Sequence, residues 1–208
     1  APFRIQEMPA MEEEARMLVS PQRLTETVSH LCGLGEKVSG GDEERKACDY
    51  ITQQLSSYGY EPKVHVFDSY ISYPRATALR IHASSDYDIP AVGVAFGLST
   101  PPEGATAEVI FVGAGDKAGF AGRDARGKIA LMTKLPSPNN ALEAAKNGAL
   151  GMICMSAGKQ RHKMIVTPVW GTPEFEQAKN IPRLHVASIS AEDGRRIRDD
   201  LEKGPVKA

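Results

Sequence analysis

The sequence predicts an α+β protein in which a short helical leader precedes a mostly β part. Apolar residues recur at helical spacing as far as Tyr58, and beyond Gly59 they alternate with polar residues or gather in short runs. Glycine, proline and aspartate separate these later runs, as they commonly separate strands. The change of period therefore divides the chain into a helical leader and a strand-rich remainder.

The first predicted helix of the leader begins at Ser20-Pro21. Serine is a favoured N-terminal cap, and proline is favoured at the first helical position. Leu24, Val28 and Leu31 then fall on one face of this helix. Gly33 is expected to end it.

The second predicted helix begins around Ser39-Gly40-Gly41-Asp42, where Ser39 and Asp42 have the spacing of a capping box. Gly59 stands where a left-handed C-terminal cap is expected. A strand is predicted after it, because Val64 and Val66 alternate with polar residues. We expect the strands near Val64 and Leu79 to leave an exposed edge that favours association.

The remainder of the chain consists of short apolar runs interrupted by two predicted helices. One helix follows Asn139-Asn140, and the other follows Ser190, whose capping box closes at Asp193. The predicted strands are Leu79–Ile81, Ala91–Phe96, Val109–Val112, Lys128–Met132, Met152–Met155 and Leu184–Ile189.

Composition excludes several classes of function. The 208 residues are 41% hydrophobic, a share that favours a packed core. Their formal net charge of -1 provides no broad cationic field for nucleic acid. No apolar run approaches the roughly 20 residues of a membrane span. Three cysteines exclude a disulfide scaffold, although Cys32 and Cys48 lie in neighbouring predicted helices and are either a pair or a helix contact.

The short motifs of common enzymes are absent or incomplete. Gly113, Gly115 and Gly119 match neither dinucleotide nor P-loop spacing. Ser156 lacks the first glycine of a nucleophile elbow. None of the five histidines has a partner four residues away or the His-x-Asp spacing of a shared metal site. We therefore assign no catalytic and no metal-binding residue.

One aromatic residue is a candidate for binding. Trp170, the only tryptophan, lies in a loop stiffened by Pro168 and Pro173. It either anchors this loop to a core or lies at an interface, where indole side chains are enriched. We retain Trp170 as a possible interface or lid residue.

The strand-rich part resembles the protease-associated domain. The resemblance rests on the order and spacing of Val109–Gly113, Asp124–Leu131, Glu143–Ile153 and Ile181–Ser190. It implies a sandwich or open barrel with two to three helices, and we place this domain at residues 75–208. The resemblance also implies that this domain acts as a lid or as a module that contacts substrates or partners.

The leader, placed at residues 1–74, resembles the di-zinc aminopeptidases of peptidase clan MH. The similarity lies in Leu31–Gly35, Ser39-Gly40, Asp49–Ile51 and Tyr58–Tyr60. In that family a leader of this kind precedes the inserted domain. The glutamate carboxypeptidase and transferrin-receptor branches share the layout, so the leader alone does not determine activity.

The family resemblance also implies where the chemistry lies. Its members bind two zinc ions through a His-x-Asp pair and later Asp, Glu and His ligands, all of which would lie beyond Ala208. We expect no cofactor in this chain, two zinc ions in its parent, and the missing catalytic domain and a peptide substrate as partners. A secreted or cell-surface location is implied by the family. The alternative is a binding or receptor-type module whose parent lacks peptidase activity.

Overall fold

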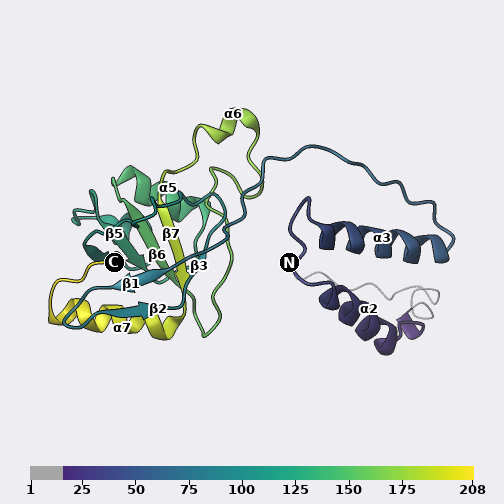
Figure 1. The fold of residues 1–208 in the computed structure, drawn as a ribbon, viewed down its shortest axis with the longest axis horizontal. Coiled ribbons are helices and arrows are strands. Elements are labelled where there is room, and N and C mark those ends of the chain that lie inside the picture. The colour runs from purple at the N-terminus through teal and green to yellow at the C-terminus, as the bar shows by residue number, and fades with distance from the viewer. Residues whose placement is uncertain (1–15) are drawn as a thin grey trace, which may run out of the picture. The chain divides into compact units, whose positions relative to one another are not determined.

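The computed structural model describes residues 16–208 and forms two compact units that divide between Val66 and Phe67 (Figure 1). No helix among the described residues is long and apolar enough to cross a membrane.

The first unit contains helices α2, Pro21–Gly33, and α3, Asp42–Ser57. The predicted cap of α2 is confirmed, because the Ser20 hydroxyl accepts a hydrogen bond from the Arg23 N–H at 3.3 Å. Two side-chain contacts join the helices. Arg23 Nη2 donates to the Tyr58 hydroxyl at 2.9 Å, and the rings of His30 and Tyr50 stack with centroids 4.0 Å apart.

The ends of α3 agree only partly with the prediction. Gly59 follows the C-terminal cap with a φ of 86°, the left-handed conformation expected of it. The N-terminal cap, however, is Gly41 and not Ser39. A turn with Gly40 at a φ of 77° brings the Gly41 N–H to within 2.8 Å of the Val38 carbonyl oxygen, which leaves Ser39 outside the first helical turn.

The strand predicted around Val64 does not form. Residues 60–78 contain no strand, and no strand among the described residues pairs with the segment around Val64. The alternation of apolar residues is real, but a strand needs a neighbour to pair with. Leu79, by contrast, has its neighbour, because it pairs with Ile89.

The second unit is built on an open five-stranded sheet. Four strands are parallel, and one short edge strand runs antiparallel to its neighbour. Their order is β3 (Val92–Gly93), β7 (His185–Ile189), β6 (Gly151–Met155), β5 (Ile129–Met132) and β4 (Val109–Phe111). A separate antiparallel pair consists of β1 (Leu79–Ile81) and β2 (Tyr87–Ile89).

Helices and the small sheet cover the two faces of the large sheet (Figure 1). Helix α5, Pro138–Lys146, buries Ala141 and Ala144 in a core on one face. Helix α7, Ala191–Lys203, buries Ile197 on the other face, together with Ile81 and Ile89 of the small sheet. Strands β5 and β6 are buried throughout because both of their faces are covered.

Side-chain caps set the starts of the helices that cover the sheet. Ser137 and Ser190 accept hydrogen bonds from the N–H groups of Asn140 and Asp193, so the predicted Ser190 cap is confirmed. Two four-residue helices, α4 (Lys117–Phe120) and α6 (Phe175–Ala178), were not predicted, because so few residues give no periodic signal. With helices and a mixed sheet in one chain, the predicted α+β class is confirmed.

Candidate functional site

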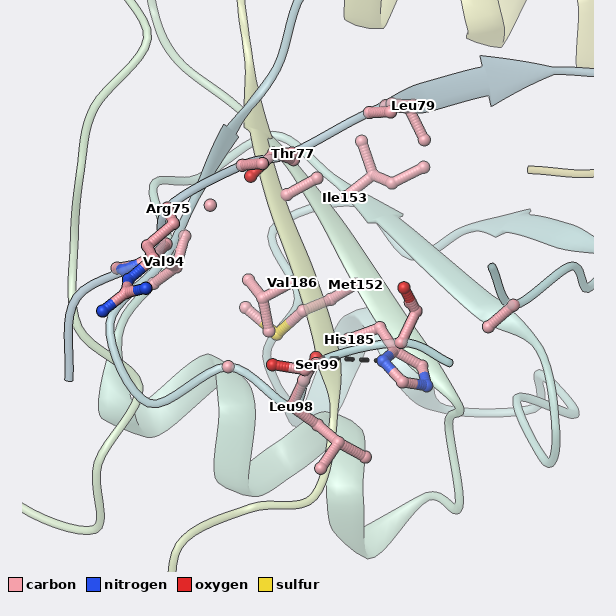
Figure 2. Close-up of a pocket in the computed structure, with 18 of the residues that line it drawn as sticks. Arg75, Thr77, Leu79, Val94, Leu98, Ser99, Met152, Ile153, His185 and Val186 are labelled. Carbon is pink, nitrogen blue, oxygen red and sulfur yellow. Dashed lines mark hydrogen bonds between the residues drawn. The ribbon is translucent and has the colours of Figure 1, made fainter. Parts of the chain in front are cut away.

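A groove of about 510 Å³ lies within the second unit (Figure 2). One wall is the extended segment 72–79, and the opposite wall is the loop of residues 97–100. The floor is formed near the start of β5, β6 and β7, with Met152, Ile153 and Val186 between the walls. The volume is within the range of small-ligand sites. We call this feature the Arg75 groove.

Three contacts fix the segment that forms the first wall. The Ser72 hydroxyl accepts a hydrogen bond from the Phe96 N–H at 2.9 Å. Lys163 Nζ donates to the Tyr73 hydroxyl at 3.3 Å and lies 5.0 Å from the centre of that ring. The segment also passes so close to Gly93 that a Cβ there would lie 2.7 Å from both Pro74 Cβ and Thr77 Oγ1.

Among the side chains that line the Arg75 groove, Arg75 is a permanent cation and none is acidic. Arg75 and His185 lie toward opposite ends of the groove (Figure 2). His185 Nδ1 is 3.0 Å from the Leu98 carbonyl oxygen. A carbonyl oxygen only accepts, so Nδ1 carries the proton, and Nε2 of a neutral ring is left as an acceptor.

Trp170 lies in the connection between β6 and β7 and is 64% exposed. It therefore does not anchor its loop to the core of this unit. That anchor is the buried Thr167, whose hydroxyl contacts the Val169 carbonyl and donates to the Gly171 carbonyl at 3.1 Å.

Sequence reasoning missed a second aromatic side chain in the same connection. Phe175, at the start of α6, is 94% exposed. In Figure 1, α6 extends beyond the sheet at the end of this connection. An apolar residue five positions after the tryptophan was the only signal in the sequence, and no periodicity accompanied it. The connection thus presents two large aromatic side chains to solvent.

The residues considered for chemistry are dispersed or enclosed. Among residues 16–208, no three His, Cys, Asp or Glu side chains are grouped as a metal site requires. Ser156 is buried, and its hydroxyl donates to the Gly158 carbonyl at 2.9 Å. All three cysteines are free, and burial raises the pKa of the Cys154 thiol. The Ser156 hydroxyl and the Cys154 thiol are therefore enclosed in the core, whereas Cys32 is exposed and Cys48 is half-buried.

The chain has relatives among curated proteins. It is 30% identical over 188 residues to carboxypeptidase Q of Bos taurus, a match that covers 82% of this chain and 37% of the relative. It is 32% identical over 177 residues to carboxypeptidase Q of Homo sapiens, and this match covers 77% of this chain and 35% of the relative. The chain thus spans a little over a third of the length of these relatives. No family model matches it.

Solved structures share its fold. An aminopeptidase from Aneurinibacillus sp. strain AM-1 is 25% identical with a TM-score of 0.60, and the match covers 90% of this chain and 43% of that one. The chain is aminopeptidase-like, of peptidase clan MH. A zinc aminopeptidase from Bacillus subtilis, 19% identical with a TM-score of 0.57, shows the same fold over 88% of this chain and 41% of its own.

The resemblance stated from the sequence is therefore confirmed at the level of the clan. It rested on blocks of sequence in both units, and the matches likewise extend over most of the chain. The relatives are peptidases by name, which makes this chain part of a peptidase-like lineage.

Proposed function

We propose that this chain is a non-catalytic part of a zinc-dependent aminopeptidase. In this proposal residues 1–74 belong to the peptidase domain, and residues 75–208 form a protease-associated domain. That domain acts as a lid or as a module that contacts substrate while the rest of the protein hydrolyses peptides. Kinship with zinc aminopeptidases and carboxypeptidase Q supports this assignment.

The observation that carries the proposal is the exposed apolar face of the leader. Leu24 and Val28 on α2 are 57% and 59% exposed, and Ile51 on α3 is 47% exposed. Ala47 is the only buried apolar residue among residues 16–66. Amphipathic helices normally bury such faces against a core. The missing partner is, in our proposal, the catalytic domain.

Zinc belongs to that partner in the proposal. Two zinc ions are expected in the whole protein, but residues 16–208 contain no suitable cluster of ligands. The described part of the chain does not fit a di-zinc centre, so no catalytic step is assigned to its side chains.

The lid role is assigned to the connection that carries Trp170. An exposed indole and the exposed Phe175 offer apolar contact area on a loop, a place where binding residues are common. As a lid, this loop would contact the part of a substrate that extends away from the zinc ions. Short substrates would not reach it.

Trp170→Ala in the whole protein tests the lid role. We expect KM for tri- and tetrapeptides to rise by about three- to tenfold, because the substrate loses an aromatic contact worth about 1 kcal/mol. KM for aminoacyl nitroanilides, which do not reach the loop, stays unchanged. Unaltered affinity for tri- and tetrapeptides would show that Trp170 is not part of a lid.

The second candidate is a binding or receptor-type module without peptidase activity. The Arg75 groove favours it, because a built cavity at the sheet needs no zinc to bind a ligand. The two candidates separate on one point. A whole protein with His-x-Asp and later Asp, Glu and His ligands is a peptidase, and one without them is a binding protein.

A further inference from the structure

The connection between β6 and β7 presents its two exposed aromatic side chains from residues 167–178, which we call the aromatic segment. Thr167, which is buried, holds one end of this segment, because its hydroxyl donates to the Gly171 carbonyl oxygen at 3.1 Å. Pro173 is buried between the two aromatic residues. The aromatic side chains are therefore uncovered although the backbone that carries them is anchored.

The second aromatic side chain stands on a closed helical turn. In α6 the Glu174 N–H donates to Gln177 Oε1 at 3.1 Å, and the Gln177 N–H donates to the Glu174 carbonyl oxygen at 2.9 Å. Phe175 is the first residue of this helix and is 94% exposed. A backbone that is already ordered loses little conformational entropy when a ligand packs on its side chains. The aromatic segment is thus built in advance of any contact.

The two aromatic side chains are within reach of one short peptide. Trp170 and Phe175 are five positions apart, so their Cα atoms lie at most about 18 Å from each other. An extended peptide of six residues covers that distance, and every second side chain of such a peptide lies on the same face. Apolar side chains on one face of a hexapeptide can therefore contact both aromatic residues.

The charges of the aromatic segment define the ligand further. Glu174 and Glu176 flank Phe175 and are exposed, and residues 167–178 contain no lysine or arginine. The first cation beyond them is Lys179, at the C-terminal cap of α6. Two carboxylates beside an apolar contact attract a ligand that brings a basic side chain to this place and repel one that brings an acidic side chain.

We propose that the aromatic segment binds an extended peptide, with apolar side chains on Trp170 and Phe175 and a basic side chain beside Glu174 and Glu176. That the ligand is a peptide rests on the proposed function, in which this loop contacts substrate. The preference for apolar and basic side chains rests on the segment itself. The segment contains no catalytic residue, and it selects which peptides are bound.

The test uses Trp170 as the probe, because the 208-residue chain contains no other tryptophan. The chain is titrated with acetyl-Leu-Ser-Leu-Ser-Leu-Lys amide and with the same peptide ending in glutamine or in glutamate. We expect Trp170 emission to shift to shorter wavelength in a saturable way as the indole leaves water. The lysine peptide should bind about fivefold more tightly than the glutamate peptide, with the glutamine peptide between them. This preference should disappear at about 1 M salt, which screens exposed charges.

Variants separate the aromatic contribution from the charge. Phe175→Ala should weaken all three peptides by about threefold or more, whereas Phe175→Leu, which keeps an apolar side chain, should weaken them less. Glu176→Gln should reduce the preference for lysine over glutamate and leave the glutamine peptide unchanged. Glu202→Gln on α7, an exposed glutamate outside the aromatic segment, is the matched control and should alter none of the affinities.

The proposal is overturned if millimolar peptide leaves Trp170 emission unchanged, if the three peptides bind equally at low salt, or if Phe175→Ala has no effect. An emission shift that follows the protein concentration and not the peptide concentration would show that a second copy of the chain occupies the segment, which also overturns the proposal. Each of these results would leave the peptidase assignment standing, since zinc-dependent hydrolysis by the whole protein is measured separately.

Discussion

At the scale of single residues, one hydroxyl joins the small sheet to α7. Tyr87 Oη donates to Asp200 Oδ2 at 2.8 Å, and the Arg196 guanidinium lies 3.5 Å from the centre of the tyrosine ring. The hydrogen bond from Tyr87, followed by that from Lys203, holds the pKa of Asp200 below its usual value. Burial, with the hydrogen bond to Asp200 second, raises the pKa of Tyr87.

Removing this hydroxyl should destabilise the second unit in a pH-dependent way. We expect Tyr87→Phe to lower the free energy of unfolding by about 1–2 kcal/mol at pH 7. The folded pKa of Asp200 lies below its unfolded value of about 3.9, so the contribution is present above that value and is lost as pH falls through the folded pKa. Urea unfolding of both proteins at pH 7 and at stepwise lower pH measures it. A difference that stays constant down to pH 2 would refute the role of the ionised carboxylate.

Local residue interactions were predictable from the sequence, and distant ones were not. The Ser20 and Ser190 caps involve residues three positions apart, and a spacing this short can be recognised directly in the sequence. Tyr87 and Asp200 are 113 positions apart, and nothing in either segment marks the other as its partner. Ser39 failed as a cap because the glycine pair after it forms a turn before the helix begins.

At the scale of elements, α7 packs against β6 through a glycine. A Cβ at Gly194 would lie 2.7 Å from Met155 Cβ and 2.9 Å from its sulfur atom. Gly194 is buried within the helix, so its missing side chain allows the close approach. The distance between helix and sheet is thus set at this position.

Gly194→Ala tests that contact against helix propensity. Alanine favours an exposed helix interior by about 1 kcal/mol over glycine, but here we expect overpacking to lower the free energy of unfolding by about 1–3 kcal/mol. Gly33→Ala in α2 is the control, because nothing lies within 4 Å of a Cβ there and no clash is expected. Chemical denaturation followed by circular dichroism measures both. A stabilised Gly194→Ala variant would contradict the close packing.

The elements of the second unit were largely predictable, but their arrangement was not. Strands β4, β5, β6 and β7 begin or end within one or two residues of the predicted runs, because covered strands appear as continuous apolar stretches. Their order in the sheet depends on crossovers that local patterns do not contain. The Arg75 groove escaped prediction for the same reason, since its walls come from residues 72–79 and 97–100 and its floor from three strands.

At the scale of the whole chain, the buried apolar residues are unequally shared. Among the described residues they lie in the second unit, with Ala47 as the exception. The hydrophobic effect therefore stabilises residues 67–208 independently and gives the leader little support of its own.

Deleting residues 1–66 should leave the main unfolding transition in place. We expect the midpoint of urea unfolding of residues 67–208 to match that of the full chain, while far-ultraviolet circular dichroism loses the signal of α2 and α3. Sedimentation should also show less association, because the exposed Leu24, Val28 and Ile51 are gone. A shortened chain without a cooperative transition would contradict the independence of the second unit.

The most direct test of the proposed function is hydrolysis of aminoacyl nitroanilides in the presence of zinc, measured for this chain and for the whole protein. The proposal predicts no zinc-dependent release of nitroaniline by the 208 residues, whose described part has no cluster of metal ligands. It predicts release by the whole protein that a chelator abolishes. Cleavage by this chain alone, or a zinc-loaded whole protein that cleaves nothing, would contradict it.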